Sequence, residues 1–255
     1  MSVVEDEALR AFRVHPFVAS LELIDQEALL QRCSVSTLGA QRTLVRAGAR
    51  ADTVFFLVRG MVAVCHREGE KLGADVLVRL GKPPSIFGLA EVLSGDLYLE
   101  HVRSLTELTF VRVPADVMKR CTTLVRGGCG AESALLLQLS QDLLATSRRV
   151  RSMAFFGSRA RLADLLLEYA DLAGEAVPGG ISIGLRLSQE ELARNLSVTR
   201  QALSRSIERF RKAGMISKEK ARYVIRNLEK LRAQGSVAPP DSLSGRASGS
   251  TVSGR

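Results

Sequence analysis

The sequence lacks the segments that would place the chain in a membrane or send it out of the cell. No stretch approaches the ~20 uninterrupted apolar residues of a membrane-spanning helix. The N-terminus, MSVVEDEALR, opens acidic and has no apolar region, which argues against a secretory signal peptide. We therefore expect a cytoplasmic protein with no membrane partner.

Cysteine is scarce and unclustered. Four cysteines in 255 residues, with no CxxC pair, argue against a disulfide framework and against a structural zinc site, so no metal site is expected. Cys33, Cys65, Cys121 and Cys129 are spread along the chain. A redox pair of Cys121 and Cys129 stays open, and buried or idle thiols are the favoured interpretation.

Catalytic motifs are absent as well. The chain has no GxGxxG, P-loop, HExxH or GxSxG sequence, and no His/Asp/Ser set with persuasive spacing. Hydrophobic residues at 46% and charged residues at 25% are typical of a globular protein. We expect no catalytic residues and no enzyme, with enzymes kept as the alternative class.

What the sequence does have is an uneven distribution of basic residues. Residues 157–255 hold 17 of the 36 Lys and Arg residues but 10 of the 27 Asp and Glu residues, a local balance of +7. Residues 1–156 balance at +2. A basic C-terminal third indicates a module that binds a polyanion, and a solvated basic surface is the alternative.

Short β segments separated by Gly and Pro fill residues 35–115. This pattern is typical of a small sandwich or barrel. Short helices are expected over residues 9–33, and a Gly/Pro loop over 174–180 is followed by β-like segments around 181–187. From residue 235 the chain is mostly Ser, Gly, Pro and Ala, so a disordered tail is expected.

A long helix is predicted over residues 131–155, which contain no Gly or Pro. One side of it follows the 3-4-3-4-3 spacing of a coiled-coil seam: Leu136, Leu139, Leu143, Thr146, Val150 and Met153. This seam predicts dimerisation. An ordinary amphipathic core helix would show similar spacing.

The most informative run is residues 186–210. Ser188 and Glu191 form a capping box, which predicts a short helix from Gln189. After a tight connection over residues 195–198, Thr199 can cap a second helix that begins at Arg200.

The second helix has one apolar and one polar face. Leu203, Ile207 and Phe210 form the apolar stripe, and the opposite face of the first turns carries Arg200, Gln201, Ser204 and Arg205. Arginine can bind guanine through two hydrogen bonds, and glutamine can bind adenine in the same way. The arrangement is typical of a helix-turn-helix, with a merely solvated helical hairpin as the alternative.

A short basic hairpin, or wing, is predicted after Gly214. Its residues Lys218, Lys220 and Arg222 would contact phosphates, which positions a domain on DNA without specifying a sequence.

Together these motifs resemble the Crp/Fnr family, which includes the cyclic-AMP receptor protein and the fumarate–nitrate reductase regulator. The resemblance covers residues 15–232 and includes LVRAG at 44–48, VFFLVRGMV at 54–62, VRSLT at 102–106 and ARLA at 160–163. It implies an α+β fold: an N-terminal cyclic-nucleotide-binding-type β-roll (a jelly roll) at 1–130, a dimerisation helix at 131–156, and a winged helix-turn-helix at 157–234. Residues 235–255 are the disordered tail.

The resemblance assigns base reading to Arg200, Gln201, Ser204 and Arg205 of a recognition helix over residues 200–210. Thr199, Ser188, Lys218 and Arg222 complete the expected DNA contacts. Many family members carry glutamate where Gln201 stands, and glutamate accepts a hydrogen bond from cytosine. We therefore expect the preferred half-site to differ from the commonest family half-sites at that base pair.

The effector is harder to infer. In cyclic-AMP-binding members a Gly-Glu pair and an Arg-Ser pair hold the ribose and the phosphate, and the Arg-Ser position falls here on Tyr98 and Leu99. Without an arginine, burial of the phosphate would leave an uncompensated charge. The tentative effector-pocket residues are Gly88, Glu91, Tyr98, Arg103, Thr146 and Ser147. Thr146 and Ser147 stand where cyclic-AMP binders contact adenine, although helix packing also explains hydroxyls there.

Other effectors are no better supported. Residues 1–32 contain no cysteine, which argues against an iron–sulfur cluster. Haem would need His15, His66, His101 or a cysteine, and a lone histidine is usually a surface or packed residue. The cofactor is therefore unknown, with cyclic AMP and an iron–sulfur cluster both disfavoured.

The sequence thus predicts a homodimeric transcription regulator that binds a palindrome on double-stranded DNA and responds to an effector through its β-roll. We expect an activator with RNA polymerase as a partner, although the sequence itself does not separate activation from repression. A regulator that needs no effector, a cyclic-nucleotide-responsive one, and a protein-interaction module without DNA binding are the alternatives.

Overall fold

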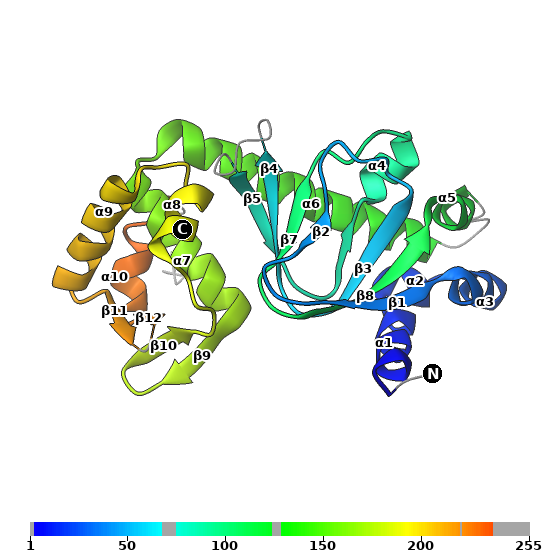
Figure 1. The fold of residues 1–255 in the computed structure, drawn as a ribbon, viewed down its shortest axis with the longest axis horizontal. Coiled ribbons are helices and arrows are strands. Elements are labelled where there is room, and N and C mark those ends of the chain that lie inside the picture. The colour runs from blue at the N-terminus through cyan, green and yellow to red at the C-terminus, as the bar shows by residue number, and fades with distance from the viewer. Residues whose placement is uncertain (1–2, 68–74, 124–128, 220, 237–255) are drawn as a thin grey trace, which may run out of the picture.

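The structure is a computed structural model that describes residues 3–67, 75–123, 129–219 and 221–236. A β-rich domain and a mainly helical domain lie side by side, and one long helix runs past the first domain and leads to the second (Figure 1).

The N-terminal domain is built on two four-stranded antiparallel sheets with the strand orders β1-β8-β3-β6 and β2-β7-β4-β5. The strands are β1 Ser34–Leu38, β2 Thr43–Val45, β3 Thr53–Arg59, β4 Val62–Arg67, β5 Asp75–Gly81, β6 Ser85–Phe87, β7 His101–Ser104 and β8 Leu108–Pro114. The chain therefore folds into the β-roll that the sequence predicts.

Strand β3 shows why this sequence forms a two-sided core. Successive side chains of a strand point to opposite faces, so Phe55 and Leu57 enter the cluster between the two sheets, whereas Val54 and Phe56 enter a second cluster under the helices. Five consecutive residues of β3 are buried as a result. An uninterrupted apolar run is what a strand covered on both faces requires.

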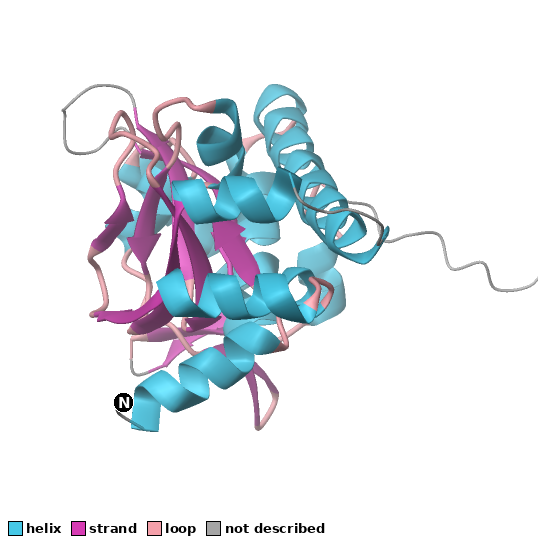
Figure 2. Ribbon diagram, turned by 90° about the vertical axis from the view of Figure 1, so that its right-hand side faces the viewer, coloured by secondary structure: helices cyan, strands magenta, loops and turns pink. Residues whose placement is uncertain are grey.

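Short helices cover that second face (Figure 2). They are α1 Val3–Arg13, α2 Pro16–Ala19, α3 Leu23–Arg32, α4 Leu89–Ser94 and α5 Ala115–Thr123. Within the N-terminal domain, the sequence indicated short helices over residues 9–33, ahead of the strands. Helices α4 and α5 were not anticipated, because six and nine residues are too few to show a clear helical period.

Helix α6, Cys129–Phe155, packs against α2 and β5. Leu135 is buried in the cluster under the helices. By contrast, five of the six seam residues are exposed, and Thr146 is half-buried.

The C-terminal domain contains a further antiparallel sheet, of order β11-β12-β10-β9. Its elements are α7 Ser158–Ala173, β9 Gly174–Val177, β10 Gly180–Ile183, α8 Gln189–Asn195, α9 Arg200–Lys212, β11 Ile216–Glu219, β12 Arg222–Ile225 and α10 Leu228–Arg232.

The prediction of a loop over residues 174–180 was wrong in part. Residues 174–177 form β9, which pairs with β10. The two strands are joined at Pro178 and Gly179, where Gly179 adopts a φ of +73°. Glycine tolerates that conformation, so the same residues that suggested a loop make the tight turn of a hairpin.

One apolar cluster crosses the boundary between the two domains. Ala63, Cys65 and Leu77 of the β-roll are fully buried against a core that includes Leu162 and Leu166 of α7. The chain is described as far as Ser236, whose backbone N–H donates to the carboxylate of Asp164. Most of the predicted disordered tail, residues 237–255, lies outside the described residues. In the described part of the chain no helix is long and apolar enough to cross a membrane.

His15 is buried beneath the sheet in an aromatic cluster. Its ring meets the ring of Phe56 edge-on, with centroids 5.1 Å apart, and its Nδ1 accepts a hydrogen bond from the N–H of Phe17 at 3.3 Å. His15 is thus the N-cap of α2. Burial lowers the pKa of His15 to about 4 from its ordinary value of 6.5.

This burial makes stability pH-dependent. In the unfolded chain His15 takes up a proton near pH 6.5, whereas in the folded chain it resists protonation until about pH 4. The free energy of unfolding should therefore be highest above pH 6.5 and fall between pH 6.5 and 4. We expect His15→Asn, which keeps an N-cap acceptor but does not titrate, to lose less stability over this range. Urea unfolding at pH 7 and pH 4.5 measures the difference. Equal losses in the two proteins would contradict the assignment.

Candidate DNA-binding site

Helix α8 begins as the sequence predicts. The backbone N–H of Glu191 donates to Ser188 Oγ at 3.1 Å, and the Glu191 carboxylate accepts from the backbone N–H of Ser188 at 3.0 Å. Both halves of the capping box are therefore present. The Ser188 hydroxyl also donates to the same carboxylate at 2.9 Å, so this side chain is engaged in capping.

The connection to the second helix is tight because Ser197 adopts a φ of +51°. Thr199 then caps α9, since its hydroxyl accepts from the N–H of Ala202 at 3.2 Å. Leu203, Ile207 and Phe210 are buried against α7 and α8. The predicted start of the second helix and its apolar stripe are confirmed.

The four residues expected to read bases lie together in the first two turns of α9. Arg200, Gln201, Ser204 and Arg205 are all exposed. Figure 1 places α9 at the outer side of the C-terminal domain, away from the β-roll. The face is therefore open to a large polyanion.

The predicted hairpin after Gly214 is present as β11 and β12. Lys218 is exposed, with its Nζ 5.3 Å from the centre of the Tyr223 ring. Arg222 instead turns toward β9, where its guanidinium lies 3.5 Å from the Glu175 carboxylate. Lys220 lies outside the described residues.

Sequence reasoning missed the residue that braces the hairpin. Arg226 donates to Ser217 Oγ at 3.0 Å and to the carbonyl of Pro178 at 2.8 Å, and it pairs with Glu219. An arginine directly after the second strand of a basic hairpin was the available signal.

Three of the tentative effector-pocket residues lie together in the β-roll. Gly88 has a φ of +78°, and a Cβ at that position would lie 2.7 Å from the Tyr98 ring. The Tyr98 hydroxyl donates to the carbonyl of Thr53, and the Glu91 carboxylate accepts from the N–H of Leu99 at 3.3 Å. At the positions where the resemblance implies the Arg-Ser pair, Tyr98 and Leu99 thus make internal hydrogen bonds.

The surroundings do not suit a phosphate. Arg79 is buried with its guanidinium 5.1 Å from the centre of the Phe87 ring, 3.5 Å from Asp142 and 3.9 Å from Glu100. Burial raises the pKa of Glu100 and of Asp142, and Arg79 opposes both shifts. Two carboxylates therefore share Arg79, and the charge of Glu91 also raises the pKa of Glu100. A cyclic-nucleotide phosphate added here would face net negative charge.

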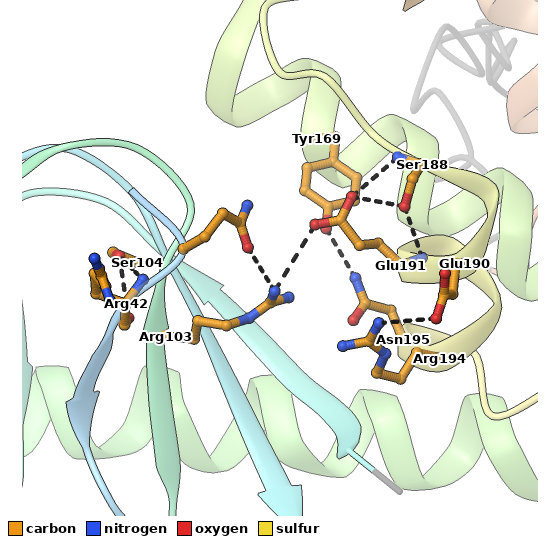
Figure 3. Close-up of polar contacts among 10 residues, drawn as sticks. Arg42, Arg103, Ser104, Tyr169, Ser188, Glu190, Glu191, Arg194 and Asn195 are labelled. Atoms are coloured by element: carbon orange, nitrogen blue, oxygen red, sulfur yellow. Dashed lines mark hydrogen bonds and ion pairs between the residues drawn. The ribbon is translucent and has the colours of Figure 1, made fainter. Parts of the chain in front are cut away.

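The remaining tentative residues are placed elsewhere. Thr146 donates from its hydroxyl to the carbonyl of Asp142 at 2.9 Å, which is a bond within α6, and Ser147 is exposed. Arg103 points away from the β-roll core and lies at the domain boundary (Figure 3).

The cysteine and histidine positions show no assembled metal site. Cys65 and Cys121 are buried and Cys33 is half-buried, and nothing is described of the Cys129 side chain. Burial raises the pKa of Cys33 and Cys121. His66 is exposed, and His101 is buried. Among the described residues, no group of three or more His, Cys, Asp or Glu side chains could hold a metal ion.

Comparisons with known proteins place both domains. Residues 35–123 match the model of the cyclic nucleotide-binding domain, and residues 160–234 match the Crp-like helix-turn-helix domain. The chain is 25% identical over 195 residues to the global nitrogen regulator of Synechocystis sp., covering 76% of this chain and 84% of that protein. It is 23% identical over 192 residues to the cAMP-activated global transcriptional regulator CRP of Pasteurella multocida, covering 75% and 89%.

Solved structures show the same fold. The c-di-GMP responsive global regulator CLP of Xanthomonas campestris superposes with a TM-score of 0.67 at 18% identity, over 81% of this chain and all of that one. A CRP-family transcriptional regulator of Thermus thermophilus gives a TM-score of 0.67 at 22% identity, over 80% of this chain and 97% of that one.

The two domains and the exposed face of α9 thus define a transcription regulator with a helix-turn-helix DNA-binding domain and a cyclic-nucleotide-binding-like domain. The chain belongs to the Crp/Fnr family. Members of this family are regulators rather than enzymes.

The exposed face of α9 yields a direct test. Arg205→Ala removes a side chain able to make two hydrogen bonds to guanine, and such a pair contributes about 1–3 kcal/mol of discrimination between bases. We expect affinity for the specific site to fall roughly 5- to 150-fold, measured by fluorescence anisotropy at fixed salt.

Arg120→Ala is the matched control. It removes the same charge from the exposed side of helix α5 of the β-roll, where its partner Asp116 is also exposed. This control should leave specific affinity unchanged. Equal losses in both variants would mean that net charge, and not the α9 face, governs binding.

Proposed function

We propose that the chain acts as a homodimer that binds a palindromic DNA site through the two copies of α9 and that its β-roll responds to an effector other than a cyclic nucleotide. The observation that carries this proposal is that the chain exposes two surfaces: the reading face of α9, formed by Arg200, Gln201, Ser204 and Arg205, and an apolar seam along α6. We infer the cytoplasm as the compartment, because DNA is the target there, and RNA polymerase as a partner at promoters.

The seam of α6 is the argument for a dimer. Leu136, Leu143 and Val150 are 63%, 67% and 61% exposed, and they recur at the seven-residue interval of a coiled coil. A row of exposed leucine and valine side chains along one helix is unfavourable in water. A second copy of α6 would cover it with the same residues in a two-fold arrangement.

A palindrome follows from such a dimer. Two recognition helices related by a two-fold axis would enter successive major grooves, which are ~34–36 Å apart on one face of DNA. Lys218 of the wing and the N-terminal turn of α9 would contact phosphates and fix the register.

The relatives suggest different signals. One is named a nitrogen regulator, another a cAMP-activated regulator, and a structural neighbour is described as c-di-GMP responsive. The carboxylates around Arg79 argue against a cyclic-nucleotide phosphate in the β-roll of this chain. A regulator that needs no effector remains the second candidate, because internal ion pairs already link β5 to α6.

The dimer is tested by placing a charge in the seam. Leu143→Glu would bury two carboxylates near the two-fold axis, one from each chain. We therefore expect the dissociation constant of the dimer to rise roughly 100-fold or more. Gln141→Glu, exposed on the far side of the same helix, should leave the dimer intact. Sedimentation velocity measures both variants. A Leu143→Glu protein that stays dimeric would place the interface elsewhere.

The DNA site is tested by selecting bound sequences from a random library with and without cyclic AMP. We expect the wild-type protein to recover a palindrome under both conditions. Gln201→Glu should shift one base pair of each half-site toward cytosine, because a glutamate accepts a hydrogen bond from the cytosine amino group.

Each alternative has its own outcome in this selection. A palindrome that appears only with cyclic AMP would show that the β-roll binds the nucleotide despite its carboxylates. A wild-type half-site that already has the glutamate-type preference would contradict the role given to Gln201.

A further inference from the structure

A cavity lies between the β-roll and the C-terminal domain, apart from the seam of α6 and from the reading face of α9. Its volume is about 300 Å³, which is large enough for a small metabolite. Gln41, Arg103 and Leu105 form the β-roll side. Tyr169, Arg186, Asn195 and Arg222 are among the residues on the other side. Figure 3 shows Arg103 reaching from β7 toward α8 across this boundary.

The lining is rich in positive charge. Three arginines, Arg103, Arg186 and Arg222, line the cavity together with one carboxylate, that of Glu191. Arg222 is also paired, at 3.5 Å, with Glu175, which is not part of the lining, so the excess of positive charge rests on Arg103 and Arg186. Glu191 is already committed to the N-terminus of α8, and one of its oxygens lies 3.8 Å from the Arg103 guanidinium. The excess charge therefore favours an anion.

Only some of the hydrogen-bond donors of the Arg103 guanidinium have a partner among the described residues. One of its terminal nitrogens donates to Gln41 Oε1 at 2.6 Å, and its side chain is 16% exposed. Its Nε–H is buried and has no hydrogen-bond partner among the described residues. A buried donor without a partner is unfavourable by about 1–3 kcal/mol, which a bound anion would remove.

Asn195 gives a second, independent indication of a ligand. It is 3% exposed, and its amide nitrogen donates to the Tyr169 hydroxyl at 3.0 Å. Its Oδ1 is buried without a partner in the described structure. The Tyr169 hydroxyl accepts the bond from Asn195, so its own proton can serve an acceptor in the cavity.

The cavity thus offers guanidinium and hydroxyl donors together with one amide acceptor. We propose that it binds a small hydroxylated anion, whose carboxylate or phosphate lies against Arg103 and whose hydroxyl donates to Asn195. Malate and glycerol 3-phosphate are the simplest probes of the two kinds of anion. Both kinds of anion would use the same hydrogen-bond donors, so a comparison of the two probes shows whether the site prefers a carboxylate or a phosphate.

The position of the cavity gives the ligand a regulatory consequence. A bound anion would compete with Glu191 for Arg103 and would link β7 to α8, the first helix of the helix-turn-helix. This consequence rests on the proposed DNA-binding function, whereas the binding itself does not.

Titration calorimetry with the full chain tests the site. The wild-type protein should bind malate or glycerol 3-phosphate saturably, with one site per chain, at concentrations up to about 10 mM. Arg103→Gln should weaken binding at least roughly tenfold, because it removes the charge but keeps a polar side chain. Arg112→Gln, a change of an exposed arginine on β8, should leave binding unchanged. Failure of both probes to bind the wild-type protein, or equal binding by Arg103→Gln, overturns the proposal.

Succinate separates the role of Asn195 from a purely structural one, since it is malate without the hydroxyl. Wild-type protein should prefer malate roughly tenfold over succinate, and Asn195→Ala should lose this preference. If malate is the probe that binds, an unchanged preference in a folded Asn195→Ala protein contradicts the placement of the hydroxyl. If the Asn195 variant does not fold, the Arg103 comparison still decides the proposal.

Regulation is measured separately, as the affinity for the selected DNA with and without the probe that binds. A change in wild type that is absent in Arg103→Gln supports the regulatory consequence. If binding is present but DNA affinity is constant, that consequence fails and the site remains. If selection recovers no DNA, the proposed function fails independently of the site.

Discussion

The apolar cluster that joins β5 to α7 and α8 at the domain boundary determines where the reading face of this regulator points. Leu77 of β5 is buried with Leu162 and Leu166 of α7, and burial of each such side chain contributes about 1.5–3 kcal/mol. Polar contacts align the same surfaces, since Glu168 accepts from the N–H of Leu80 at 3.3 Å and pairs with Arg149 of α6 at 3.4 Å. With α7 held against the β-roll in this way, α9 lies on the opposite side of the domain (Figure 1). Anything that changes the junction would therefore move the face that meets DNA.

Helix α6 connects this junction to the proposed second subunit. Arg149 of α6 contacts Glu168, and Asp142, two turns earlier on the same helix, lies 3.5 Å from Arg79 of β5. The residues of the seam, such as Leu143 and Val150, alternate with these polar contacts along the helix and are exposed. One helix therefore carries contacts to the β-roll and to α7 and also a face for a partner. A rotation of α6 would be transmitted to the β-roll, to α7 and to the partner subunit. The fold thus has a physical route from sensing to the spacing of two recognition helices.

The parts of the structure that sequence reasoning predicted are those with local causes. The capping box of Ser188 and Glu191 and the N-cap Thr199 act over three residues, so their spacing alone predicts two helix starts. The position of Arg103 has a non-local cause. Alternation along β7 sends Val102 into the sheet core and Arg103 to the other face, where α8 happens to lie. No pattern within β7 could reveal that Asn195, 92 positions later, would share a cavity with it. The strand β9 was missed because its pairing with β10, and not its composition, makes it a strand.

The two candidate ligand sites, the pocket of the β-roll around Arg79 and the cavity at the domain junction, differ in the sign of their charge. This difference indicates which of them can hold an anionic signal. In the β-roll, where the resemblance implies the phosphate site of members that bind cyclic AMP, this chain has Glu100 and Asp142 against Arg79. At the domain junction it has three arginines against Glu191, which caps α8, and Glu175, which pairs with Arg222. An anion is therefore repelled from the first site and attracted to the second. Because Arg79 already bridges β5 to α6, the β-roll can remain docked on its helix without a ligand. A signal bound at the junction would then act on the DNA-binding domain directly, through α8, and would not need to pass through the sheet.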